Sequence, residues 1–336
     1  MSQNPIIPTQ AVSCDICQAD RPSPSRRKFL AASAATASLL ASSPSMVFGG
    51  TTAEQSAEST IAELYKSLSS DQRNVVAREW TDPLRKKVNA NWHVTKPLIG
   101  GDFYTSTQKS MVESIVKQLT SESGYERLKL QTEDDDGGIE AYSMALFGKP
   151  GDEKFEWMLT GRHLTLRADG NCQDKIVFGG PVVYGHGEES TPKANIFYYQ
   201  TEKVQSVYES LTADQRKLAL VSSAPPAEAN VPTQGPQGKF LGLQISSLQQ
   251  EQKTLFQSAL TSILSMYRDE DTSEATSILE QSGGVDNLRI AYFSKNDLLD
   301  DGIWDIWRIE GPSAVIHFRG APHVHAYIHI GIPKAS

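Results

Sequence analysis

The sequence predicts an α+β fold in which helices and antiparallel β-meanders recur in two similar halves. Two repeated patterns carry this prediction. A phrase that opens a helix occurs three times, beginning at Leu68, Leu211 and Leu248. A longer pattern of strand, turn, strand and strand occurs twice, in residues 141–170 and 291–320. Helices and strands are therefore segregated within each half, which argues against a parallel sheet of alternating strands and helices.

The chain begins with a segment typical of an export signal. Arg26 and Arg27 precede a run of small and apolar residues that ends at Ala41, and paired arginines in this position are typical of the twin-arginine (Tat) pathway. The run is too short for a membrane-spanning helix, which needs about 20 residues. We therefore expect residues 1–49 to be recognised by the Tat translocase and removed. Residues 50–336 would then be periplasmic or secreted, without a permanent membrane anchor.

The net charge and the cysteine content argue against nucleic-acid binding and against an internal disulfide. The expected leader holds four basic and two acidic residues, so its removal changes the net charge from −8 to about −10. A chain this acidic is not expected to bind nucleic acid. Cys14 and Cys17 form a C-x-x-C pair but would leave with the leader, so we do not interpret them as a redox or metal motif. Cys172 then remains alone, and no internal disulfide is expected.

Helix starts are recognisable from their capping residues. Ser69 and Thr212 each have a Gln three residues later, which is the pattern of a capping box. Apolar residues then recur at helical spacing. These signals predict helices over residues 70–80, 107–120, 212–222 and 248–267.

The repeated strand pattern has the alternation of polar and apolar residues typical of half-buried strands. In the first copy residues 155–159 lead through a turn to residues 163–167, and in the second residues 303–309 lead to residues 314–319. The two copies therefore predict two antiparallel meanders.

A segment rich in proline and glycine separates the meanders. Its composition excludes regular secondary structure over residues 222–239. We expect this segment to join two halves, about 60–221 and 240–336, of a single α+β domain that spans residues 50–336.

Four consecutive acidic residues, Glu133 to Asp136, precede Gly137 and Gly138. The stretch lacks the alternating oxygen ligands and the downstream glutamate of an EF-hand calcium loop. We interpret it as a solvent-exposed turn.

The clustering of histidines in the strand regions is the main chemical signal. His323 and His325 alternate along a strand, so both rings lie on one face, where two imidazoles can bind one metal ion. If the halves pack about a pseudo-twofold axis, the strands that carry His163 and His317 become neighbours. Together with His186, these residues are the metal-ligand candidates. Hydrogen-bonded structural histidines and acid–base catalysis without a metal remain the alternatives.

His186 ends a glycine-rich phrase that runs from Phe178 to His186. The phrase lacks the spacing and the following helix of a phosphate-binding loop. Its glycines allow close backbone approach, so we expect a shaped turn with Tyr184 and His186 at its tip. This tip either lines a pocket or packs in the core.

Several of these phrases resemble a family of exported bacterial proteins, catalogued as domain of unknown function 3500. The resemblance covers most of the chain after the leader and rests on the phrases at residues 157–166, 178–186, 211–216 and 307–325. It implies Tat export and an α+β fold, and it supplies no established reaction.

Two functions remain open from the sequence. The first is a metal-dependent protein, redox or oxygenase-like rather than hydrolytic, with His163, His323 and His325 as ligands of copper, iron or zinc. His186 or His317 would complete the ligand set. Arg162 and Arg319 would bind an anionic substrate or a supporting carboxylate such as Glu310.

The alternative is a non-enzymatic binding protein for an anionic or sugar-like small molecule. Tyr184, Trp304 and Trp307 would then be stacking surfaces for the ligand. A third interpretation is an exported domain with a purely structural role. The sequence identifies neither catalytic residues nor the ligand.

Overall fold

The computed structural model describes residues 56–170, 175–187, 192–297 and 300–333. The expected leader, with Arg26, Arg27, Cys14 and Cys17, lies outside these residues, and so does Cys172. Export and leader removal therefore stay predictions. Among the helices in the described part of the chain, none has the length and apolar character needed to span a membrane.

One mixed sheet runs through the described domain, with strand order β1-β2-β3-β4-β5-β11-β10-β9-β8-β6 and with β7 paired to β8. All neighbouring strands are antiparallel except the pairs β1–β2 and β6–β8, which are parallel. The strands are β1 (Ala77–Arg78), β2 (Ser143–Gly148), β3 (Phe155–Gly161), β4 (Leu164–Ala168), β5 (Val182–His186), β6 (Leu220–Val221), β7 (Leu243–Gln244), β8 (Arg289–Phe293), β9 (Ile306–Gly311), β10 (Ala314–Arg319) and β11 (Val324–Ile330).

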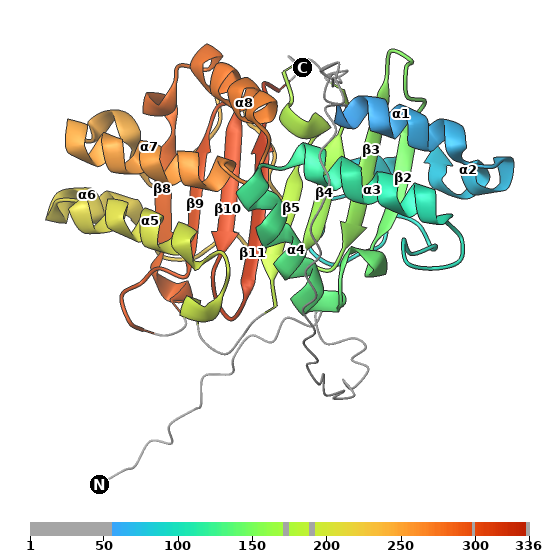
Figure 1. The fold of residues 1–336 in the computed structure, drawn as a ribbon. Helices are drawn as coiled ribbons and strands as arrows, with labels where there is room; N and C mark the ends of the chain where they lie inside the picture. Colours follow the sequence, from blue (N-terminus) through green and yellow to red (C-terminus); the bar gives the residue numbers. More distant parts are fainter. Residues whose placement is uncertain (1–55, 171–174, 188–191, 298–299, 334–336) are drawn as a thin grey trace, which may run out of the picture. The chain divides into compact units, whose positions relative to one another are not determined.

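The two predicted meanders are present and meet at the centre of this sheet (Figure 1). The first consists of β2 to β5 and the second of β8 to β11. Strand β5 pairs with β11 in antiparallel register, from His186 opposite Val324 to Val182 opposite Ile328. The α+β class is therefore confirmed, while the relation of the two halves as repeats stays a prediction.

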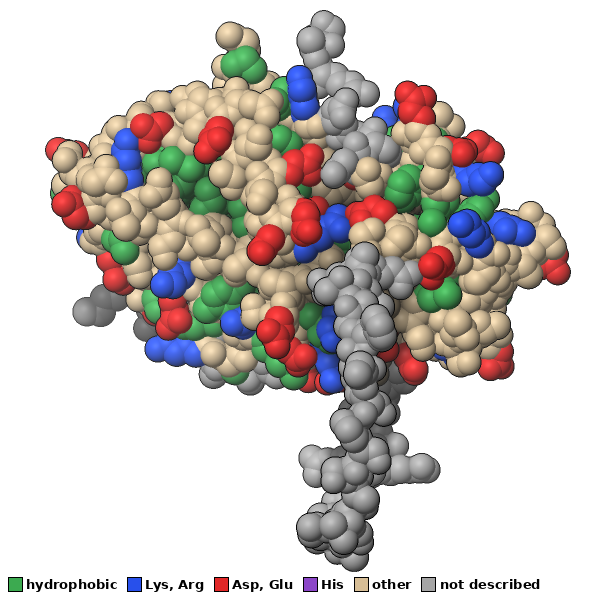
Figure 2. All heavy atoms as spheres, turned by 45° about the horizontal axis from the view of Figure 1, so that its top comes forward, with side chains coloured by type: hydrophobic (Ala, Val, Ile, Leu, Met, Phe, Trp, Pro, Cys, Tyr) green, Lys and Arg blue, Asp and Glu red, His purple; other side chains and the backbone are tan. Residues whose placement is uncertain are grey.

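The α-helices cover one face of the sheet (Figure 1). They are α1 (Ala57–Ser67), α2 (Ser70–Val76), α3 (Ser106–Leu119), α4 (Glu122–Asp136), α5 (Tyr198–Ser210), α6 (Ala213–Ala219), α7 (Gln250–Leu264) and α8 (Asp269–Gln281). Their apolar sides pack on the sheet through one large cluster that includes Ile115, Trp157, Phe256 and Trp307. On the side of the molecule drawn in Figure 2, acidic and basic side chains are interspersed.

The predicted capping boxes at Ser69 and Thr212 are both present. The helices that they open, α2 and α6, are shorter than predicted and end at Val76 and Ala219. In each case the chain passes directly into a two-residue strand that pairs in parallel with β2 or β8. The helices therefore end early because the residues of β1 and β6 pair with neighbouring strands, although apolar residues continue at helical spacing.

The second face of the sheet is covered by chain without long helices. Residues in the ranges 88–90 and 229–231 pack there against Val183, Val315 and Tyr327. Residues in the range 92–94 pack against Ala145 and Met158. Strand β3 is consequently buried at every position. The expectation of half-buried strands was wrong, because the segment 222–239, which has no helix or strand, lies on this face together with residues 79–95.

Candidate metal centre

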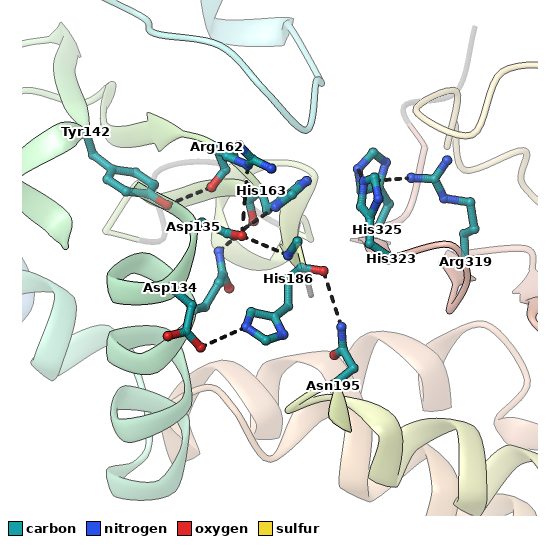
Figure 3. Close-up of polar contacts among 12 residues, drawn as sticks. Asp134, Asp135, Tyr142, Arg162, His163, His186, Asn195, Arg319, His323 and His325 are labelled. Carbon is teal, nitrogen blue, oxygen red and sulfur yellow. Dashed lines mark hydrogen bonds and ion pairs between the residues drawn. The ribbon is translucent and has the colours of Figure 1, made fainter. Parts of the chain in front are cut away.

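Three histidines converge where the two meanders meet. His163 lies in the turn between β3 and β4, His323 lies just before β11, and His325 lies within β11. One ring nitrogen from each residue lies within 4.8 Å of the others. All three side chains are buried. Figure 3 shows His323 and His325 together on one side and His163 on the other.

His163 is held in an unusual backbone conformation. It has a φ of 54°, in the left-handed region that residues other than glycine rarely adopt. Such a conformation costs about 1–3 kcal/mol and persists only where the surroundings impose it. Here the His163 N–H donates to the Ala90 carbonyl at 2.5 Å, and the His163 carbonyl accepts from Nε2 of Gln131 at 2.8 Å. The turn is therefore fixed from both sides.

Two glycines make room for this turn. A methyl group at Gly161 would overlap the ring of Tyr142, whose hydroxyl donates to the Arg162 carbonyl at 2.7 Å. A methyl group at Gly185 would lie 3.1 Å from Cβ of His163. Gly185 therefore leaves room for the Val324 carbonyl of β11 and for His163. The expected turn with Tyr184 and His186 at its tip is wrong, because both residues lie in the buried strand β5, which pairs with β4 and β11.

Asp135 orients the ring of His163. Its Oδ2 lies 2.8 Å from Nδ1 of His163, and its Oδ1 accepts from the Gly187 N–H at 2.8 Å. Nε2 of His163 is buried and has no hydrogen-bond partner among the described residues. The ring therefore presents this nitrogen to the space between the three histidines.

Glu228 orients the ring of His325 in the same way. Its Oε1 lies 2.6 Å from Nδ1 of His325 and accepts from the Tyr327 hydroxyl at 3.1 Å. Nε2 of His325 then lies 3.0 Å from Nε2 of His323. Nitrogen ligands of one tetrahedral zinc ion are about 3.3 Å apart, given Zn–N bonds of about 2.0–2.1 Å. The spacing of these two nitrogens is close to that of a metal shell.

The protonation states also suit metal binding. Burial is the largest cause that lowers the pKa of His323 to about 2, with smaller effects of His325, His163 and Arg319. Burial lowers the pKa of His325 to about 4. Both rings are neutral at pH 7, and a neutral imidazole is the form that binds metals. Burial raises the pKa of Glu228, but the contacts with His325 and Arg319 outweigh it and bring the pKa to about 2.

Two arginines flank the histidines. Nη2 of Arg319 lies 3.4 Å from Nε2 of His323, and its Nε lies 3.5 Å from Glu228 Oε2. Nε of Arg162 lies 3.9 Å from Oδ1 of Asp135. The side chains of Arg162 and Arg319 are 29% and 12% exposed, so both remain partly accessible.

His186 and His317 lie outside this group. Nε2 of His186 pairs with Asp134 at 3.0 Å, so its ring faces the end of α4 (Figure 3). Nδ1 of His317 accepts from Nε of Arg308 at 3.3 Å. The expected adjacency of the His163 and His317 strands is not found, because β5 and β11 lie between β4 and β10.

The remaining candidates lie away from the three histidines. Glu310 pairs with Arg308 at 3.7 Å and accepts from the Leu241 N–H. Tyr184 is 1% exposed and its hydroxyl donates to Gln200 at 2.5 Å. Trp307 is also 1% exposed and stacks on Phe318, while the ring of Trp304 lies against that of Tyr208. Tyr184 and Trp307 therefore pack in the core rather than offering stacking surfaces.

The carboxylates of the site were not anticipated from the sequence. The acidic stretch expected to be an exposed turn forms the last turn of α4, which ends at Asp136 and is capped by Gly137 with a φ of 79°. Asp135 is buried there, with a side chain only 2% exposed. Four acidic residues at a helix C-terminus oppose the helix dipole. This local conflict was the signal available in the sequence. Glu228, in the proline-rich segment, carried no comparable signal.

Comparison with known proteins gives a match to a family model. The family model described as "Protein of unknown function (DUF3500)" matches residues 50–331. No curated protein and no solved structure matches the chain. The matched range contains the three histidines, both carboxylates and both arginines.

The lowered pKa values predict acid sensitivity of the metal-free protein. Between pH 7 and pH 5 the unfolded histidines, with a pKa of about 6.5, take up protons that the folded rings of His323 and His325 do not. The unfolded state therefore binds more protons, and the free energy of unfolding falls as the pH falls. We expect a fall about 3 kcal/mol larger in the parent than in His323→Asn/His325→Asn. Urea unfolding at the two pH values measures it, and equal falls would contradict the assignment.

Proposed function

We propose that this chain, which belongs to the DUF3500 family of proteins of unknown function, binds a transition metal ion through His163, His323 and His325. The observation that carries the proposal is the convergence of three buried imidazoles, two of which are oriented by a carboxylate on Nδ1. Metal-binding histidines commonly donate their second ring N–H to such a carboxylate, which fixes the tautomer and raises the basicity of the ligand nitrogen. A histidine that only stabilises the fold through hydrogen bonds does not need two other imidazoles beside it.

The donor set favours copper, iron or zinc. Imidazole nitrogens suit these ions, whereas calcium and magnesium prefer oxygen ligands. Three protein ligands leave at least one coordination position open, which is typical of catalytic rather than structural sites.

We favour redox or oxygenase-like chemistry over hydrolysis. The two carboxylates that contact the histidines, Asp135 and Glu228, already accept hydrogen bonds from ring nitrogens and from other groups. Neither is placed to act as a general base toward a bound water. A copper or iron ion at the site would supply electron transfer or oxygen chemistry, and the residues described here would hold the ion and bind the substrate.

The two arginines support an anionic substrate. Arg162 and Arg319 flank the histidines and are partly exposed, and guanidinium groups bind carboxylates through paired hydrogen bonds. Arg319 also approaches Glu228, so its position depends on the carboxylate that orients His325. A substrate carboxylate bound by these arginines would be held beside the three histidines.

The leader pattern supports a function outside the cytoplasm. We propose that the Tat translocase exports the folded chain to the periplasm or the medium. We also propose that the two meanders are structural repeats, with the metal centre at their junction. A non-enzymatic binding protein for an anionic or sugar-like ligand is less well supported, because Tyr184 and Trp307 are buried.

Metal content is the first test. We expect about one copper, iron or zinc ion per chain in protein purified without a histidine tag, and loss of the ion in His163→Asn. Asparagine tolerates the left-handed backbone of this position, so the variant should fold. His186→Asn is the matched control and should keep its metal. Elemental analysis decides: a parent that takes up none of the three metals, or equal metal content in both variants, would refute the proposal.

The orienting carboxylates give a second test. Asp135→Asn and Glu228→Gln should each weaken metal binding about 10- to 100-fold, because the imidazole ligands lose their fixed orientation and part of their basicity. Asp134→Asn is the control, since its exposed carboxylate neighbours Asp135 in sequence but pairs with His186. Competition titrations with a chromophoric chelator measure the affinities. Equal affinities in all three variants would show that these carboxylates do not support a metal.

A further inference from the structure

A concave site lies on the face of the sheet that carries no long helices. It is a cavity of about 640 Å³, and it contains none of the three histidines of the proposed metal centre. Its walls come from the 3₁₀ turn Pro83–Lys86, from β4, from the glycine-rich phrase before β5 and from residues 227–232. A volume of this size is typical of small-molecule sites.

The cavity is cationic although the chain as a whole is acidic. Arg85, Lys86 and Arg167 line it, and no aspartate or glutamate does so among the described residues. Glu156 pairs with Arg85 at 3.0 Å and with Arg167 at 2.5 Å, so one carboxylate offsets only one of the three positive charges. The excess positive charge attracts an anion, and low-dielectric walls strengthen that attraction.

Arg167 gives the cavity a rigid base. Its side chain is 1% exposed, and its guanidinium donates to the backbone carbonyls of Pro181, Arg85 and Lys87. These bonds tie together the strand, the glycine-rich phrase and the 3₁₀ turn. The cavity wall is therefore fixed before any ligand binds, which reduces the entropy cost of binding.

The remaining lining provides an apolar surface and one polar contact. Val88, Ile176, Val231 and Pro232 supply the apolar wall. His329 donates from Nδ1 to the Val231 carbonyl at 2.7 Å, and burial lowers its pKa, so its ring is neutral and Nε2 is a hydrogen-bond acceptor. The lining thus combines a cationic end with an apolar body, the pattern of a site for an amphiphilic anion.

We propose that this cavity binds a free organic carboxylate with an apolar body, with its head group near Arg85 and Lys86. The site is independent of the proposed metal centre, although residues 227–232 contribute to both through Glu228 and Val231. The test variants therefore avoid that segment, and they leave Arg85 and Arg167 paired with Glu156.

Calorimetric titration of the full chain with octanoate, below its micellar concentration, tests the proposal. The parent should bind octanoate, bind 1-octanol at least about tenfold more weakly, and not bind octyltrimethylammonium. Lys86→Glu should weaken octanoate binding at least about tenfold, because it replaces a cation at the cavity with an anion. Ile176→Trp should block binding by filling the cavity.

Lys203→Glu is the matched control, because it makes the same charge change at an exposed site on α5. It should bind octanoate as the parent does, and thermal unfolding of each variant verifies folding. Three results would each overturn the proposal: no octanoate binding by the parent, equal affinity for octanoate and 1-octanol, or equal affinity of the Lys86→Glu and Lys203→Glu variants. None of these results depends on the metal content of the protein, so the cavity proposal and the metal proposal can fail separately.

Discussion

The pairing of β5 with β11 is the constraint on which the candidate site depends. This pairing joins two meanders that are far apart in the sequence, and it brings the β3–β4 turn of the first beside the start of β11 in the second. His163 therefore meets His323 and His325 across a junction that neither meander contains alone. Gly185, opposite His325 in this pairing, leaves the space that His163 occupies. A shift of this register by one residue would turn the His325 side chain to the other face of the sheet.

Unfavourable local features are concentrated at this junction. His163 adopts a left-handed backbone conformation, and Asp135 lies at a helix C-terminus where the dipole disfavours a carboxylate. His323 and His325 are buried as neutral rings whose nitrogens face one another. Such conflicts between local preference and the fold are typical of functional sites, because the rest of the structure must stabilise them. A bound metal ion would compensate several of them at once, through bonds to nitrogens that otherwise face each other.

The fold class, the two meanders and the shared face of His323 and His325 could be predicted from the sequence, because they follow from local periodicity. The junction between β5 and β11 could not be predicted from the sequence, since the order of strands depends on pairing between distant segments. His317 was grouped with His163 on an assumed symmetry, whereas two strands separate them. Asp135 was assigned to an exposed turn, and Glu228 lies in a segment without secondary structure, where side-chain direction follows only from tertiary contacts.

Anomalous diffraction from crystals of the metal-loaded protein is the most direct test of the metal centre. Data collected at the absorption edge of the ion locate it without reference to the surrounding side chains. We expect one peak, about 2.0–2.1 Å from Nε2 of His163, His323 and His325. A strong peak elsewhere, with these three rings bonded only to protein groups, would contradict it.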